Sequence, residues 1–535
     1  MAIHLMIAPA ASGKTHRCIQ RLKELRASAS AGPLAPVWVC LPNALQVSAF
    51  RARLAAEGGL LGIRSGAFGS FYRDLLSRGP LIPRPQLAAA AQYRVLRVLA
   101  EEAARRGELP HYGPIAAKPG FCQELLSLIR ELKALYIRPA ELARLWGDGA
   151  PAQRDLAALY ARYQGWLEAH GWADEEELGW QALDALDESP DLGRDLALLL
   201  VDGFDHLDEV QLRALARLGQ RVGELCITLT GQAGPARLAQ RRFDRAREAL
   251  EARLGVSPTY EDAEARLHPA LARLERHIFD IAPPHLPDGQ GAIAFLEATD
   301  PPGEAREALR WLKARVVQDG YSPGQVALLA RDLGPYRSYL REAAAEFGLP
   351  LRLADQEPLA SNPCIAALLD LLALALRDWP WRQVVDAWRS PYLDWGGLGV
   401  EIAPADADRL AAAAHWGQVV QGRAAWQETL ARLARPIAEA AGDDESREAP
   451  FPPEEGQRLL SLWQGFVRAV EPPPLGTVAE QIRWVEERIG PLPDEEDEGE
   501  GGASLRLGQR AQHPDPAIQR RDERALHAFK EVLRG

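Results

Sequence analysis

Residues 2–25 read AIHLMIAPAASGKTHRCIQRLKEL, and this stretch decides the fold class of the chain. The apolar run over 2–8 predicts a buried strand, and the apolar positions from Thr15 to Leu25 recur with the period of a helix. The octapeptide Ala8–Thr15 connects the two and matches the phosphate-binding loop G-x-x-x-x-G-K-[ST], except that Ala8 replaces the first glycine. Strand, loop and helix in this order predict an α/β domain built around a phosphate-binding loop.

The chemistry of this loop depends on its backbone and on its polar side chains. Backbone N–H groups at the start of the helix, with the positive end of the helix dipole, hold phosphate oxygens. In this motif the lysine reaches the β- and γ-phosphates, and the last hydroxyl holds magnesium. We therefore predict a nucleotide site at Ser12, Gly13, Lys14 and Thr15 with ATP and magnesium as cofactors, although the change at Ala8 leaves open that the site is vestigial.

The segments that follow continue the pattern of a parallel sheet. Residues 37–41 predict a second strand and 46–56 a second helix, an order that favours parallel strands with right-handed crossovers. The sheet is expected to resume with strands over 196–202 and 224–230, followed by a helix over 243–254.

A second α/β unit is predicted further along, where strands over 292–298 and 326–330 flank a helix over 304–318. Two other stretches, 86–186 and the region from Trp379 onward, predict helices alone. The fold class is therefore α/β, with P-loop parallel-sheet domains and two large all-helical insertions.

The composition excludes several classes of protein. With 47% hydrophobic and 25% charged residues, the chain is not disordered, collagen-like or a membrane protein. Its longest apolar runs, 196–201 and 365–376, are too short or too interrupted to cross a bilayer, so we expect no membrane partner. The scattered cysteines argue against an iron–sulfur cluster in this segment and suit a reducing cytoplasm. The acidic segment 494–500 predicts a disordered loop.

The net charge of −12 conceals an uneven distribution. Residues 1–100 contain thirteen Lys or Arg against three Asp or Glu, a charge of +10, so the rest of the chain carries −22. A basic amino-terminal region is compatible with a local phosphate-binding face. The alternative is that arginine is frequent everywhere, as a GC-rich genome would dictate.

A phosphate-binding loop needs an acidic residue at the end of a nearby strand, and Asp202 has that place. In active hydrolases of this kind the next residue is a glutamate that activates water, whereas here it is Gly203. Asp205, Asp208 and Glu209 follow, but out of register with that base. We expect these three to form a solvated loop and the acidic first turn of a helix.

In the order of its motifs the chain resembles the superfamily 1 helicases, and most closely the AddB-type (RexB-type) subunit of bacterial AddAB helicase–nucleases, a relative of RecC. In that family a DGF motif stands in place of the active DE pair. Apart from the phosphate loop, the resemblance is carried by Leu41-Pro42-Asn43, Phe68-Gly69-Ser70-Phe71, Pro119-Gly120-Phe121 through Glu131-Leu132-Lys133, Asp202-Gly203-Phe204, and Val326 through Arg331 followed by Tyr336 and Gly348-Leu349-Pro350.

The resemblance implies P-loop RecA-like parallel-sheet domains in a superfamily 1 helicase-like arrangement. The Gly-Asp-x-x-Gln sensor of active helicases is replaced by TGQA at 230–233. The chain ends before any match to the last two helicase motifs or to the nuclease domain of the family, so we expect the N-terminal part of a longer protein. The expected domains are 1A (1–85 and 191–285), the helical insertion 1B (86–190), the first part of 2A (286–378) and a 2B-like helical insertion (379–535).

The resemblance also implies roles for residues outside the loop. Arg331 matches the motif IV arginine that reaches the γ-phosphate, and Asp202 is the second catalytic residue and a magnesium ligand. The alternative for Arg331 is an ordinary ion pair with Asp332 or another neighbour.

DNA contact is expected in the loop that resembles the DNA-facing one and in the basic residues around it. The aromatic residues of this stretch, Phe68, Phe71 and Tyr72, fit base stacking, although such a trio lies more often in a core. The predicted DNA-binding residues are Arg64, Ser70, Phe71 and Arg73. The next candidate groove lies in the helical insertion, at Arg130, Lys133 and Arg138.

Three functions remain open. The first is a helicase-like subunit of a double-strand-break repair helicase–nuclease, which binds and guides DNA, as a single strand or duplex end, with a degenerate ATPase site beside an AddA-like motor–nuclease subunit. The second is an active ATP-dependent DNA translocase of the UvrD type, and the third a P-loop nucleotide-binding protein unrelated to DNA. Gly203 favours the first, because without a carboxylate there hydrolysis falls by orders of magnitude.

Overall fold

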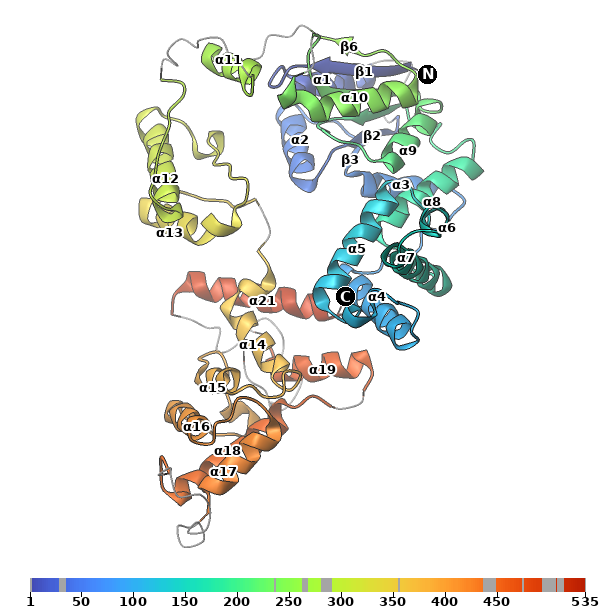
Figure 1. Cartoon of the computed structure of the whole chain (residues 1–535). Helices are drawn as coiled ribbons and strands as arrows, with labels where there is room; N and C mark the ends of the chain where they lie inside the picture. Colours follow the sequence, from blue (N-terminus) through green and yellow to red (C-terminus); the bar gives the residue numbers. More distant parts are fainter. Residues whose placement is uncertain are drawn as a thin grey trace. The chain divides into compact units, whose positions relative to one another are not determined.

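A computed structural model describes residues 2–27, 35–234, 237–261, 268–280, 291–354, 357–435, 449–473, 476–492, 507 and 514–534. The chain divides into two compact units, 1–351 and 352–535 (Figure 1). The first contains a parallel sheet and a set of helices inserted into it, and the second is helical.

Among the described residues, the sheet has six strands in the order β3-β2-β4-β5-β1-β6, and every neighbouring pair is parallel. The carboxyl ends of β1, β4 and β5 therefore meet at one edge, where parallel sheets of this type bind ligands. The strands are β1 (Ala2–Ala8), β2 (Val37–Cys40), β3 (Ile63–Gly66), β4 (Leu198–Val201), β5 (Glu224–Thr230) and β6 (Thr259–Tyr260).

The expected strands 2–8 and 224–230 are confirmed residue for residue, and those at 37–41 and 196–202 are confirmed with shorter bounds. The sequence analysis missed β3 and β6. Neither has an apolar run, because β3 reads IRSG and β6 has only two residues. Each is held as a strand by pairing with its neighbour in the sheet: β3 pairs with β2, and β6 pairs with β1.

Helices cover both faces of the sheet. Alternate strand residues point to opposite faces, so that Val37 and Val39 join one core while Trp38 and Cys40 join the other. On the first face pack α1 (Lys14–Ala27) and α2 (Ala44–Ala56). On the second face lie α3 (Phe68–Arg78), α8 (Glu175–Glu188), α9 (Glu209–Gly219) and α10 (Arg241–Leu254).

The expected all-helical insertion after β3 is confirmed. Its core contains the fully buried Tyr160 and Tyr163 together with Leu96 and Ile129. In Figure 1 its helices extend as a group from the sheet beside α3 and α8. They are α4 (Ala89–Arg105), α5 (Pro119–Ala134), α6 (Pro139–Trp146) and α7 (Pro151–His170).

After the sheet come α11 (Pro269–His277), α12 (Pro301–Gln318) and α13 (Arg337–Phe347), and the last two pack against each other. The strands predicted over 292–298 and 326–330 are wrong, because the structure assigns neither segment to a strand. A strand is held by hydrogen bonds to a neighbouring strand. Neither segment pairs with a strand in the described part of the chain. Phe295 and Leu329, 96% and 92% exposed, accordingly have their side chains in solvent.

The second unit is built from helices around a core rich in tryptophan, in which Trp426, Trp463 and Phe466 are fully buried. This confirms the expected helices after Trp379, whereas the acidic segment 494–500 lies outside the described residues. The helices are α14 (Pro363–Ala373), α15 (Trp381–Arg389), α16 (Pro404–Trp416), α17 (Arg423–Leu433), α18 (Pro453–Val470), α19 (Val478–Ile489) and α21 (Pro516–Arg534).

Short 3₁₀ helices lie at Gly113–Ile115, Leu238–Gln240, Pro323–Gln325, Gly334–Tyr336, Leu359–Ser361 and Gly396–Leu398. None of the helices in the described part of the chain combines the length and the apolar character that a membrane span requires.

Candidate nucleotide site

The loop between β1 and α1 has the conformation of a phosphate cradle. Gly13 has φ +92°, in the left-handed region that favours glycine, and Ala11 has φ +57°. The Lys14 ammonium folds back and donates to the backbone oxygens of Ala8, at 3.0 Å, and Pro9, at 2.7 Å. Ser12 Oγ is buried and has no hydrogen-bond partner within the described residues. The loop thus has a hydroxyl and an ammonium available for an anion.

Asp202 lies beside this loop, as the sequence predicted. Its Oδ2 accepts a 2.8 Å hydrogen bond from Thr15 Oγ1, and its Oδ1 accepts one from Thr228 Oγ1. Thr228 was missed by the sequence analysis, but the register could have indicated it, because Val201 pairs with Ile227 and the residues that follow each lie side by side. The strand order β4-β5-β1 therefore joins the acid to the loop through β5.

The electrostatics of the site suit a phosphate. Burial lowers the pKa of the Lys14 ammonium, and the nearby Asp202 acts in the opposite direction. A bound phosphate would add further negative charge and favour the charged ammonium. The donors present, Ser12 Oγ and Lys14 Nζ, with the oxygens of Thr15 and Asp202, therefore fit a nucleotide with magnesium.

The position after Asp202 lacks the glutamate of an active hydrolase, and its backbone has a conformation that favours glycine. Gly203 has φ +86°, where any L side chain is strained. A Cβ at this position would lie 2.5 Å from Gln46 Oε1, the far end of an exposed side chain of α2, and 3.5 Å from Pro42 Cδ. Gln46 is a second residue of the site that the sequence analysis missed, since it lies near Gly203 only in the folded chain.

The acidic residues that follow are all engaged elsewhere. Asp205 pairs with Arg242, and Asp208 caps α9 by accepting a 2.7 Å hydrogen bond from the Gln211 N–H. Glu209 accepts from Arg213 at 2.6 Å and also from Arg253. The expectation that these acids form a loop and the acidic start of a helix is confirmed, and none of the three replaces the missing base.

The sequence of the chain is similar to one family model and to several known proteins. Residues 5–251 match the family model described as ADDB, N-terminal. The chain is 27% identical over 416 residues to a protein of Moorella thermoacetica, and 29% identical over 421 residues to one of Heliobacterium modesticaldum. Both relatives are named as the B-type component of an ATP-dependent helicase/deoxyribonuclease. These matches confirm the resemblance to the AddB-type subunits.

Each of these alignments covers 72% of this chain and 35% and 33%, respectively, of the relative. The chain therefore spans about a third of the length of these AddB-type proteins. The matched family region contains most of β1, the phosphate loop, the helical insertion, Asp202 and β5, and thus all of the residues that build the site described above.

One of the predicted DNA contacts is incompatible with the structure. Phe71 is fully buried, with its ring 5.4 Å from that of Trp38 in an edge-to-face contact, so it cannot stack on a base. Phe68 and Tyr72 are also buried, and the core alternative for this aromatic trio is the correct one. The other three predicted contacts, Ser70, Arg64 and Arg73, are exposed.

The basic character of residues 1–100 is largely neutralised by folding. Among the described residues, seven of the thirteen cations form ion pairs with acids, most of them from later elements: Arg17–Glu261, Arg21–Glu224, Lys23–Glu57, Arg64–Asp74, Arg78–Asp195, Arg84–Glu177 and Arg97–Glu101. Arg53, Arg73 and Arg94 are exposed, and no partner for them is found in the described part of the chain. The surface formed by residues 1–100 is therefore less positive than the composition of this segment indicates.

The expected second DNA groove is partly wrong, whereas the role of Arg331 stays a prediction. Lys133, proposed as part of a second DNA groove, is fully buried and cannot serve there, and Arg138 pairs with Asp184 at 3.0 Å. Arg331 is exposed and lines a hollow of about 620 Å³ between α12 and the segment before α13. Asp332, the alternative partner of Arg331, accepts a 2.9 Å hydrogen bond from the Gly334 N–H.

Proposed function

We propose that this chain is the helicase-like N-terminal portion of an AddB-type subunit of a DNA double-strand-break repair helicase–nuclease. It holds a nucleotide at a degenerate ATPase site and guides DNA, as a single strand or duplex end, while an AddA-like partner subunit supplies the motor. The domain boundaries expected from the sequence, 1A with insertion 1B and 2A with a 2B-like insertion, belong to the same proposal.

One observation carries the degenerate site. Lys14, Thr15 and Asp202 are assembled as a nucleotide site requires, yet Asp202 is followed by Gly203 at φ +86°. Hydrolysis needs a base that takes the proton of the attacking water. The acids next along the chain pair with arginines or cap a helix, so none of them supplies that base, and the proposed site would bind a nucleotide without hydrolysing it.

The residues of the chain divide the work of holding a nucleotide. The N–H groups at the start of α1 and Ser12 Oγ would hold phosphate oxygens, with Lys14 as the counter-charge. Thr15 and Asp202 would hold magnesium, which when bound neutralises phosphate charge. Arg331 is proposed as the γ-phosphate contact, reaching the site from the segment between α12 and α13.

The test is a pair of measurements on the same preparation. We expect the chain to bind a fluorescent ATP analogue in magnesium and to lose this binding in Lys14→Ala, while ATP turnover stays at background with or without DNA. Turnover of several per second that DNA stimulates and Lys14→Ala abolishes would support an active translocase instead. Nucleotide binding with no DNA affinity at any salt concentration would support a P-loop protein unrelated to DNA.

A further inference from the structure

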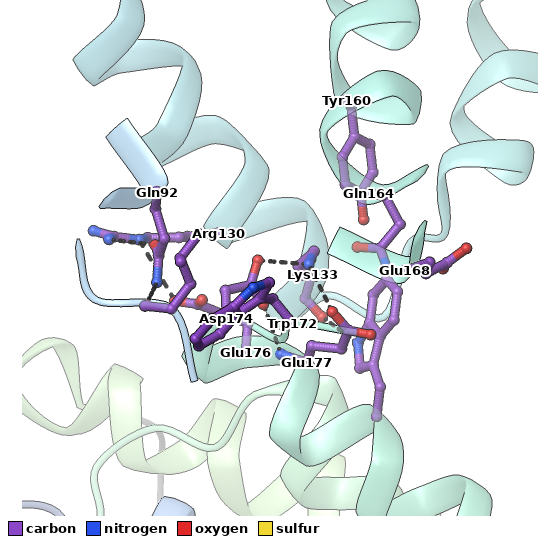
Figure 2. Close-up of polar contacts among 12 residues, drawn as sticks. Gln92, Arg130, Lys133, Tyr160, Gln164, Glu168, Trp172, Asp174, Glu176 and Glu177 are labelled. Atoms are coloured by element: carbon purple, nitrogen blue, oxygen red, sulfur yellow. Dashed lines mark hydrogen bonds and ion pairs between the residues drawn. The ribbon is translucent and has the colours of Figure 1, made fainter. Parts of the chain in front are cut away.

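Six charged side chains gather where the helical insertion joins the sheet domain. They are three bases and three acids in close contact, and four of them come from the two chain segments that connect the insertion to the sheet or follow directly from them. Figure 2 labels all of them except Arg84. We call this group the junction cluster, and it consists of Arg84, Arg130, Lys133, Asp174, Glu176 and Glu177.

Lys133 of α5 is at the centre of the junction cluster and has 0% of its side chain exposed. Its ammonium donates to Asp174 Oδ2 at 2.6 Å and lies 3.8 Å from Glu177 Oε2. It also lies 5.5 Å from the ring centroid of Trp180, with which it makes a cation–π contact. A fully buried ammonium is stable only when paired in this way.

The two carboxylates that face Lys133 belong to the first turn of α8. Asp174 is the N-cap of this helix, and its Oδ1 accepts from the Glu177 N–H at 2.9 Å. Glu177 reaches in the other direction, with Oε1 3.0 Å from Arg84 in the segment that leads into the insertion. Lys133 and Arg84 therefore hold the start of α8 from two sides.

The backbones of the connecting segments are also joined at this place. Gln86 and Ala173 form an isolated parallel bridge, with hydrogen bonds of 2.8 Å from Leu87 N to Ala173 O and 3.0 Å from Ala173 N to Pro85 O. This bridge lies directly before Asp174 in the chain. The segment that enters the insertion and the segment that leaves it are thus hydrogen-bonded to each other beside the junction cluster.

Glu176 and Arg130, at the outer side of the junction cluster, are farther apart than the central pair. Glu176 Oε1 lies 3.8 Å from Arg130 Nε, and its Oε2 is buried with no hydrogen bond in the described residues. Arg130 also donates to Gln92 Oε1 at 3.1 Å, which ties α5 to α4. From α7, Gln164 and Tyr163 face the same region, each with a buried oxygen that lacks a partner within the described residues. Figure 2 shows Gln164 and Glu177 next to Lys133.

We infer that the junction cluster is a lock that fixes the orientation of the helical insertion on the sheet domain, with Lys133 as its positioning residue. Removing the ammonium leaves Asp174 and Glu177 buried with too little positive charge, which opens the site where both connections pass. Since α8 packs on α3 and α9, the lock also connects the insertion to the helix that follows Asp202. The inference does not depend on nucleotide or DNA binding.

The test is hydrogen–deuterium exchange of the whole chain carrying Lys133→Met. We expect exchange at least tenfold faster in peptides that cover 84–88 and 171–177, and no change in peptides from β1 and β4. Asp174→Asn keeps the N-cap while it removes one charge. The double variant Lys133→Met/Asp174→Asn is therefore expected to recover most of the protection.

The matched control is Arg97→Met, which removes the exposed Arg97–Glu101 pair of α4 and should leave exchange unchanged. If Lys133→Met does not fold, Glu177→Gln keeps the shape of the site and should produce a smaller rise in the same two segments. Unchanged exchange in these segments, or an equal rise in β1 and β4, would overturn the inference, since it would show that Lys133 contributes nothing local or only global stability.

Discussion

The Thr15 hydroxyl donates a 2.8 Å hydrogen bond to Asp202 Oδ2, although 187 residues separate the two positions in the sequence. The helical insertion and three further strands lie between them in the chain. The candidate nucleotide site is therefore completed only when β4 has paired with β2 and β5, on the far side of the insertion.

Asp202→Ala is expected to destabilise the protein. Asp202 is 3% exposed, and its loss would leave the Thr15 and Thr228 hydroxyls without their acceptor. We expect the free energy of unfolding in urea to fall by about 2–3 kcal/mol. The control is Asp205→Ala, which removes an exposed pair with Arg242 and should change stability by less than about 0.5 kcal/mol.

Gly203→Glu is expected not to create a hydrolase. The variant puts a carboxylate after Asp202 but forces a non-glycine residue to φ +86°, which costs about 1–2 kcal/mol. Gln46 is flexible and can move aside, so Gly203→Glu/Gln46→Ala should behave in the same way. Steady-state ATP hydrolysis checks this, and DNA-stimulated turnover in either variant would mean that the backbone tolerates the base.

Arg73→Glu is expected to weaken DNA binding without unfolding the chain, because Arg73 is exposed and no partner for it is found among the described residues. Affinity should fall for all sequences, and the salt dependence should lose about 0.7 in slope for single strands. Fluorescence anisotropy at several salt concentrations measures both. Arg245→Glu, an exposed reversal on α10, serves as the control.

Arg64 requires a different substitution from Arg73. It pairs with Asp74, so a glutamate at this position would put two carboxylates together and confuse binding with stability. Because Asp74 already neutralises part of the charge of Arg64, Arg64→Gln is expected to weaken DNA binding less than Arg73→Glu does. A salt-independent affinity, or one that Arg73→Glu does not alter, would contradict DNA contact through this region.

Glu176→Gln is expected to stabilise the protein at neutral pH. Burial raises the pKa of this carboxyl, so the folded chain binds a proton at pH values where the unfolded chain has released it, and stability falls as pH rises above the usual range of a glutamate. Glutamine removes this loss. We expect a gain of about 1 kcal/mol at pH 7 and almost none at pH 4. Urea unfolding at both pH values measures it, and Glu175→Gln, exposed in the same turn, should show no such difference.

The sequence by itself determined the elements whose pattern is local. The run over 2–8, the Gly13-Lys14-Thr15 turn and the helix after it follow from apolar periodicity and from one glycine, and the strand 224–230 from a segment rich in apolar and β-branched residues. The absence of a base after Asp202 was also readable, because it depends on the identity of one residue.

Only the tertiary structure decided which charges and rings are available. From the sequence, Phe71 was compatible with a DNA contact or with a core. In the structure it packs against Trp38 of β2. From the sequence, Lys133 was expected at the surface. In the structure it is buried and lies beside Asp174 and Glu177. The strands expected over 292–298 and 326–330 have suitable residues but no neighbour among the described ones. The physical reason is the same in each case: a pattern along the chain records local preference, whereas burial, ion pairing and strand formation depend on partners that only folding brings into contact.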